Sequence, residues 1–276
     1  MLSPLLETTF ATLDHGKQLR VSRLGTGRPL VLLHGYPENL QIWSCLAPLL
    51  AERFEVVAFD WPGQGYSEEW PGGATPQLLA RRLLTILDAL HIDRPSIVGL
   101  DMGGQPALAF AAAYPDRVDC LVVMNSLVFG DAATSWEIYL LRKFGFNRFA
   151  LRNLPGTIFR RAETTFLPRS VQLDPALRED LWSAFRQLQV RRFISKMCAG
   201  YQGTLPVLPE LYAQIRCPTQ VLWGDHDKHF PLVQATRLQA AIEHSQLKVV
   251  AGGTHWMVLD RAIEIADCIK QHALTQ

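Results

Sequence analysis

The chain has 276 residues, of which 48% are hydrophobic and 19% charged, and its formal net charge at pH 7 is +1. This composition supplies ample apolar material for a large core and argues against a disordered chain. A charge this close to zero, without a basic run elsewhere, creates no field that would attract phosphates, so we expect neither nucleic acid nor a membrane surface as a partner.

Short apolar runs rich in aliphatic and β-branched residues alternate with longer runs of helical period, a pattern typical of α/β proteins. Near-continuous apolar character predicts buried strands over residues 29–33, 54–59, 96–100, 120–124, 220–223 and 247–250. Helices are predicted over residues 76–91, where leucines recur at helical spacing, and over residues 103–114, where small residues allow close packing on a sheet.

The alternation of strands and helices stops between residues 127 and 213, where aromatic and basic residues cluster and helical patterns follow one another. Cys217-Pro218 then favours an extended backbone, which returns the chain to the sheet. We therefore interpret residues 127–213 as a helical lid inserted into a core formed by residues 1–126 and 214–276.

Cysteine usage and the N-terminus indicate the cellular environment. The five cysteines include no CxxC pair, which argues against a disulfide framework and against a zinc site. The first residues lack a long apolar stretch, and no apolar run reaches the ~18 residues of a membrane-spanning helix. We expect a cytoplasmic protein, either a monomer or a homodimer.

The chemistry is indicated by a turn between a predicted strand and a small-residue helix. Residues 99–104 (GLDMGG) stand where many hydrolases have the G-x-S-x-G nucleophile elbow, with Asp101 in place of serine. The loop His34-Gly35-Tyr36-Pro37 follows the first strongly buried strand, where such enzymes build an oxyanion hole. The backbone amides of Tyr36 and Met102 are the predicted donors.

Two motifs near the end of the chain complete a catalytic order. Trp223-Gly224-Asp225-His226-Asp227 ends one strand, and Gly252-Gly253-Thr254-His255 follows the last strand. Nucleophile, acid and histidine therefore occur in the order that is typical of one hydrolase fold.

On these motifs the chain resembles the α/β-hydrolase superfamily over nearly its whole length, and most closely the epoxide hydrolase and haloalkane dehalogenase branch. The resemblance implies that Asp101 is the nucleophile, that His255 activates water, and that Asp227, with Asp225 as a competitor, orients the histidine. A carboxylate is ionised at pH 7, so it can attack an sp3 carbon and form an alkyl ester. No metal or cofactor is implied.

Neighbouring residues favour the epoxide side of this branch. Met102 stands where haloalkane dehalogenases have tryptophan, and Gly104 and Gln105 stand where fluoroacetate dehalogenases have arginines, whereas an aromatic residue such as Tyr36 is common in the loop of epoxide hydrolases. Tryptophan after the nucleophile is usual in epoxide hydrolases as well, so Met102 departs from both patterns. Epoxide hydrolases also use lid tyrosines as acids, and the resemblance implies Tyr201 and Tyr139 for this role.

The aromatic character of the lid predicts a small hydrophobic substrate. We expect its contacts to come from Tyr36, Met102, His34 and Trp136. We interpret the lid arginines, Arg142 among them, as a solvated helix face, with recognition of an anion as the alternative. The predicted function is hydrolysis of a hydrophobic epoxide to a diol. The alternatives are a haloalkane dehalogenase, a lyase or cofactor-free oxygenase, and a non-catalytic ligand receptor, since the fold supports all of them.

Overall fold

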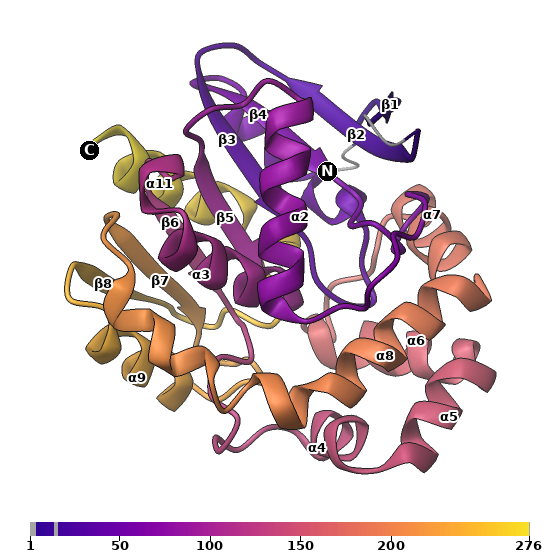
Figure 1. The fold of residues 1–276 in the computed structure, drawn as a ribbon. Helices are drawn as coiled ribbons and strands as arrows, with labels where there is room; N and C mark the ends of the chain where they lie inside the picture. The colour runs from indigo at the N-terminus through magenta and orange to yellow at the C-terminus, as the bar shows by residue number, and fades with distance from the viewer. Residues whose placement is uncertain (1–3, 14–15, 276) are drawn as a thin grey trace.

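A computed structural model describes residues 4–13 and 16–275 of the protein. The described strands form one eight-stranded sheet in the order β1-β2-β4-β3-β5-β6-β7-β8 (Figure 1). They are β1 (Thr9–Thr12), β2 (Gln18–Leu24), β3 (Arg28–Leu33), β4 (Phe54–Phe59), β5 (Ser96–Leu100), β6 (Leu121–Met124), β7 (Thr219–Gly224) and β8 (Ser245–Val250). Strand β2 is antiparallel to both β1 and β4, and the remaining neighbours pair in parallel. The sheet confirms the mostly parallel α/β-hydrolase fold class.

The strands from β3 to β8 lie at the predicted positions to within two residues, whereas β1 and β2 were not predicted. The reason is the polarity of these two strands, which lie at one end of the sheet. Strand β1 is short and mostly exposed, and β2 carries the buried polar residues Arg20 and Ser22, so neither shows the near-continuous apolar run of a strand covered on both faces.

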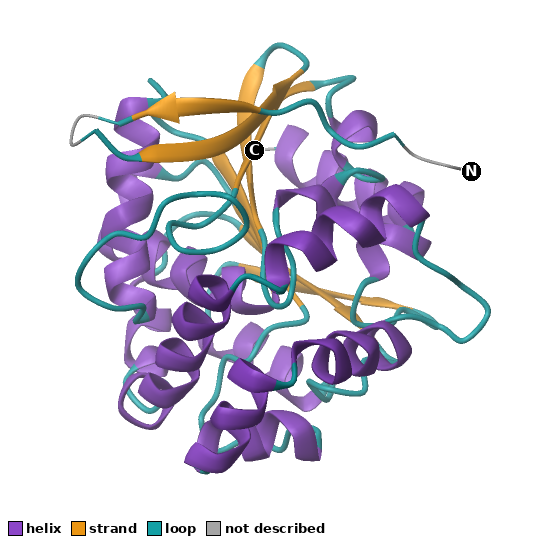
Figure 2. Cartoon of the chain, turned by 90° about the vertical axis from the view of Figure 1, so that its right-hand side faces the viewer, coloured by secondary structure: helices purple, strands orange, loops and turns teal. Residues whose placement is uncertain are grey.

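Helices cover both faces of the sheet (Figures 1 and 2). Alternate residues of a strand point to opposite faces, and in β3 Val31 and Leu33 join one buried cluster while Leu30 and Leu32 join the other. The first cluster includes residues of α2 (Pro76–Ala89), α3 (Gly104–Ala113) and α9 (Val233–Ala241), and the second includes residues of α1 (Ala47–Leu50), α10 (Met257–Asp260) and α11 (Ala262–Leu274). Short 3-10 helices are η1 (Leu40–Trp43), η2 (Asp101–Gly103), η3 (Pro115–Arg117) and η4 (Leu208–Gln214).

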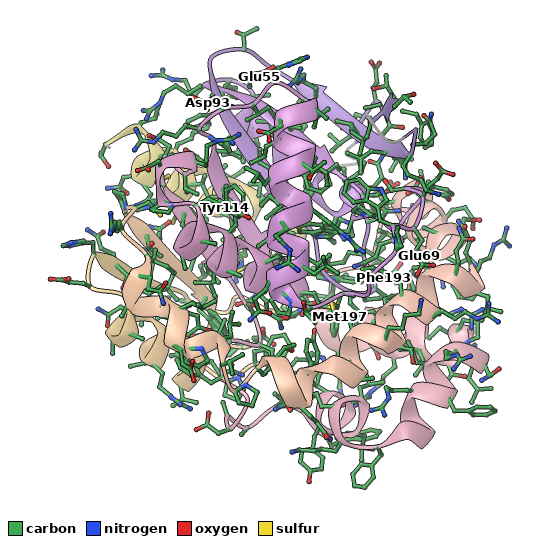
Figure 3. The ribbon with its side chains drawn as sticks, viewed as in Figure 1. Glu55, Glu69, Asp93, Tyr114, Phe193 and Met197 are labelled. Atoms are coloured by element: carbon green, nitrogen blue, oxygen red, sulfur yellow. The ribbon has the colours of Figure 1, made fainter. Side chains whose placement is uncertain are left out.

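A group of helices lies between β6 and β7 in the chain. These are α4 (Trp136–Lys143), α5 (Gly145–Asn153), α6 (Pro155–Phe166), α7 (Pro175–Phe185) and α8 (Leu188–Thr204). Phe193 and Met197 of α8, labelled in Figure 3, are buried in the same cluster as α2 and α3. On α7, Asp180 pairs with Arg20 of β2 at 3.0 Å, which ties this helix to the sheet. None of the described helices combines the length and the apolar character that crossing a bilayer requires.

Candidate active site

Asp101 lies at a strained turn between β5 and α3. Its backbone has φ +50°, a left-handed conformation that is rare for a residue with a side chain. The turn is possible because small residues surround it: a Cβ atom at Gly103 would come within 2.1 Å of the Leu33 carbonyl oxygen, and one at Gly35 within 2.4 Å of the Asp101 Cβ. The elbow therefore projects the Asp101 carboxylate away from the sheet and toward the loop after β3.

The loop after β3 binds this carboxylate. The backbone N–H of Tyr36 donates a hydrogen bond of 2.7 Å to Asp101 Oδ2, and the backbone amide of Met102 also stabilises the ionised carboxylate. Burial raises the pKa of Asp101 to about 6, although the charge of His255 and the two amides oppose this increase. The Asp101 carboxylate is therefore mostly ionised at pH 7.

His255 lies beside Asp101, and its Nδ1 atom contacts Asp227. His255 Nδ1 and Asp227 Oδ2 are 2.9 Å apart, and both side chains are fully buried. Burial alone would lower the pKa of His255, but the charge and hydrogen bond of Asp227, with smaller contributions from Asp101 and Glu38, raise this pKa to about 9. Asp225, the competing acid, instead accepts a hydrogen bond from the Gly252 amide at 2.7 Å and so shapes the loop that carries His255.

Two residues that the sequence did not single out support the loops around His255. Asn125, at the end of β6, donates to the carbonyl oxygens of Thr254 and His255. His229 contacts the hydroxyls of Ser135 and Thr165 through its two ring nitrogens, which connects the loop after β7 to α4 and α6. Burial lowers the pKa of His229 to about 4, so this second histidine is neutral at pH 7.

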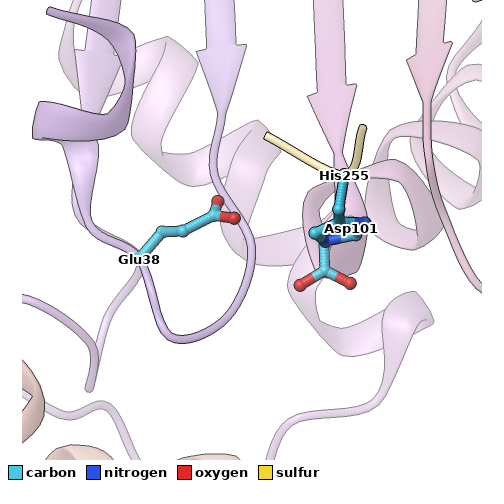
Figure 4. A group of neighbouring side chains, drawn as sticks. All are labelled: Glu38, Asp101 and His255. Atoms are coloured by element: carbon cyan, nitrogen blue, oxygen red, sulfur yellow. The ribbon is translucent and has the colours of Figure 1, made fainter. Parts of the chain in front are cut away.

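Glu38 is a further residue that sequence reasoning missed. Figure 4 shows its side chain pointing toward Asp101 and His255, and one ligand atom from each of the three buried residues lies within 4.8 Å of the others. Its Oε1 accepts from Trp256 Nε1 at 2.5 Å and its Oε2 accepts from the Gly35 amide at 2.8 Å.

Burial, reinforced by the Asp101 charge, raises the pKa of Glu38 to about 8. Because both of its oxygens already accept hydrogen bonds, the Glu38, Asp101 and His255 group suits proton transfer better than metal binding. The available sequence signal was an acidic residue immediately after the 34–37 loop, which faces Asp101.

Two cavities near Asp101 share several lining residues. The inner cavity, of about 20 Å³, is lined by Tyr36, Asp101, Met102, Leu127, Ile138, Leu141, Arg142, Cys198, Tyr201 and Phe230. The outer cavity, of about 480 Å³, is mainly apolar and is lined by residues of α4, α5 and α6 together with Tyr36 and His229. Tyr36, Ile138 and Leu141 line both cavities, so a molecule that reaches Asp101 from the outer cavity passes these three side chains.

Two buried phenols face the inner cavity. Tyr201 and Tyr36 are 5% and 6% exposed, and a hydrogen bond links the Tyr201 side chain to Gln105. Burial raises the pKa of both phenols well above its ordinary value, and the charges of Cys198 and Asp101 act in the same direction. Both phenols therefore keep their protons at neutral pH and can donate them to a bound molecule.

Three predicted residues do not reach Asp101. Tyr139 is 48% exposed, its ring contacts Phe144, and it lines neither cavity, so its predicted role as a second acid needs correction. His34 is fully buried, its ring nitrogens contact the Trp61 amide and the Gly35 carbonyl oxygen, and it lines neither cavity, so it supports the loop. Trp136 is 64% exposed and lines only the outer cavity.

Comparisons with known proteins agree with this geometry at the level of the fold. The model of a family described as alpha/beta hydrolase fold matches residues 28–262. The chain is 28% identical over 265 residues to a 2-hydroxy-6-oxononadienedioate/2-hydroxy-6-oxononatrienedioate hydrolase of Paraburkholderia xenovorans, a match that covers 90% of this chain and 88% of that protein. An uncharacterized protein of Mycobacterium tuberculosis is 26% identical over 268 residues, covering 93% and 78% of the two chains.

The solved structures include an epoxide hydrolase, CorEH without ligand. It matches 96% of this chain and 98% of its own with a TM-score of 0.81 and 20% identity. At this identity the likeness concerns the fold alone.

Proposed function

This chain belongs to the alpha/beta hydrolase fold family and is a hydrolase of that fold, and from this premise we propose that it converts an epoxide to a diol through an alkyl ester on Asp101. The observation that carries the proposal is the buried carboxylate of Asp101, held at an elbow by the Tyr36 amide and lining one cavity with two buried phenols. A carboxylate needs no base before it attacks, whereas a serine at this position would.

The first step is ring opening. An oxygen of Asp101 attacks an epoxide carbon, the bond from that carbon to the ring oxygen breaks, and the resulting alkoxide takes a proton from a phenol. Tyr201 is the expected acid and Tyr36 takes the place that the sequence gave to Tyr139, because both side chains line the inner cavity together with Asp101. An apolar substituent of the substrate fits the outer cavity, which supports a hydrophobic epoxide.

Ester formation prepares His255 for the second step. Asp101 loses its negative charge when it becomes an ester, and this charge is one of the causes of the raised pKa of His255. The imidazolium therefore becomes more acidic and gives up its proton, which restores the phenol that protonated the alkoxide. The neutral His255 ring is then available as a base.

The second step is hydrolysis of the ester. His255 Nε2 is buried and has no hydrogen-bond partner among the described residues, and Glu38 lies beside it, so a water molecule between them is well placed for attack on the ester carbonyl. His255 takes a proton from this water, Asp227 stabilises the imidazolium, and the Tyr36 and Met102 amides stabilise the oxyanion. Collapse releases the diol and regenerates ionised Asp101 and protonated His255.

We further propose that residues 127–213 act as a lid in this reaction. Side chains from α4 (Ile138, Leu141 and Arg142) and from α8 (Cys198 and Tyr201) line the inner cavity opposite Asp101. A helical cover of this kind limits the access of bulk water to the cavity in which the ester forms.

The test is to trap the ester. A His255→Gln variant incubated with styrene oxide should gain the mass of one intact epoxide on Asp101, whereas the double variant with Asp101→Asn should gain none. A 1-chloroalkane that adds only its alkyl group, with release of chloride, would identify a haloalkane dehalogenase instead. If neither reagent leaves an adduct on Asp101, the proposed alkyl-ester chemistry is wrong.

A further inference from the structure

Arg142 stands out among the charged residues around the site. It belongs to α4, it is only 6% exposed, and it lines the inner cavity together with Asp101 and Tyr201. Its guanidinium donates to the Gly130 carbonyl oxygen, and no carboxylate of the described residues pairs with it. A buried charge without a counter-ion is costly, so proteins rarely keep one unless it serves a ligand.

The other arginines of the same segment show the contrast. Arg161 pairs with Glu137 and Arg178 pairs with Glu163, in both cases with an arginine side chain that is more than 40% exposed. The acid whose charge acts on Arg142 is Asp131, but this carboxylate is 72% exposed and pairs with Arg237. The guanidinium of Arg142 is therefore a fixed positive charge at the inner cavity without a protein carboxylate to neutralise it.

We propose that Arg142 binds a carboxylate of the substrate, which makes the substrate an epoxy carboxylic acid. The inference rests on the proposed function and names its substrate class. The carboxylate lies at Arg142, the reacting carbon lies at Asp101, and an apolar substituent extends past Tyr36 into the outer cavity. This assignment replaces our interpretation of Arg142 as part of a solvated helix face.

Size and charge both favour a carboxylate attached directly to the epoxide. Arg142 and Asp101 line the same small inner cavity, so we expect the carboxylate and the reacting carbon to be close together in the substrate. A guanidinium offers five N–H donors in a planar fork, which matches a carboxylate even after one donor is used on Gly130. A substrate carboxylate also balances this cation after Asp101 has lost its charge as an ester.

The experiment compares an anionic epoxide with its neutral isostere. For trans-3-phenylglycidate, kcat/KM should fall about 10- to 100-fold in Arg142→Gln, as expected for loss of a charge-assisted hydrogen bond, whereas 3-phenylglycidamide should change less than about threefold. Arg142→Lys should recover part of the loss. The matched control is Arg160→Gln, since Arg160 is an exposed lid arginine that also donates to a glycine carbonyl oxygen.

A binding measurement separates this inference from the proposed function. The affinity of 3-phenylpropionate, which has the carboxylate but no epoxide, should fall at least tenfold from the wild type to Arg142→Gln in a calorimetric titration. That result without turnover of any epoxide would retain the carboxylate site and reject the epoxide chemistry. Equal losses of kcat/KM on the acid and the amide, or 3-phenylpropionate affinity that does not depend on Arg142, would overturn the inference and leave Arg142 as a support for α4.

Discussion

Replacing Asp227 by asparagine should separate the two steps of the proposed reaction. Asp227 Oδ1 accepts hydrogen bonds from the amides of His229 and Phe230 at 2.7 and 3.1 Å, so the oxygen of the new amide would remain there. The NH2 group would then face His255 Nδ1, which Asp227 Oδ2 now contacts at 2.9 Å. The ring would be forced to carry its proton on Nε2, the nitrogen that must accept a proton from water.

The size of the effect follows from the pKa of His255. Its increase from 6.5 to about 9 corresponds to about 3 kcal/mol of imidazolium stabilisation, most of which comes from Asp227. Ester hydrolysis should therefore slow by about 100-fold in Asp227→Asn. Ester formation should change by less than about threefold, because Asp101 attacks without a base.

Single-turnover mixing with styrene oxide, followed by intact-mass measurement, resolves the two rates. The ester should accumulate in Asp227→Asn and not in Asp225→Asn, which removes the neighbouring carboxylate bound to Gly252. If ester formation slows as much as hydrolysis in Asp227→Asn, or if Asp225→Asn accumulates as much ester, the assignment of Asp227 as the partner of the base is refuted.

Three further outcomes are expected. Tyr201→Phe should slow epoxide opening by about 100-fold, as loss of a general acid does, while Tyr139→Phe should leave the single-turnover rate unchanged. Similar rates in both variants would contradict the role of Tyr201. Because Asp101 must be ionised and its pKa is about 6, the rate of ester formation should fall about tenfold for each pH unit below that value. A rate that stays constant in rapid mixing from pH 7 to 4.5 would count against a carboxylate nucleophile. Asp180→Asn removes the nearer of the two carboxylates that pair with the buried Arg20, the other being Asp60, and should lower the free energy of unfolding in urea by about 1–3 kcal/mol. An unchanged denaturation midpoint would show that α7 does not depend on this pair.

Tertiary structure decided which of several similar residues reach the site. Asp225 and Asp227 are two positions apart in one loop, and only the fold shows that Asp227 contacts His255 while Asp225 binds the Gly252 amide. Tyr201 and Tyr139 both belong to the segment between β6 and β7, yet one is buried at the inner cavity and the other is 48% exposed. The packing of the helices sets the positions of the two tyrosines. The spacing of residues along the chain does not encode this packing.

Sequence alone determined the features that depend on local geometry. A turn that must be tight between a buried strand and a helix needs small residues, so Gly99, Gly103 and Gly104 marked the elbow and Asp101 within it. The apolar strands marked the sheet for the same reason, since burial on both faces leaves a continuous hydrophobic run. Glu38 and Arg142 carried no such local signal, because the meaning of a charged side chain depends on which groups surround it after folding, and those groups come from distant parts of the chain.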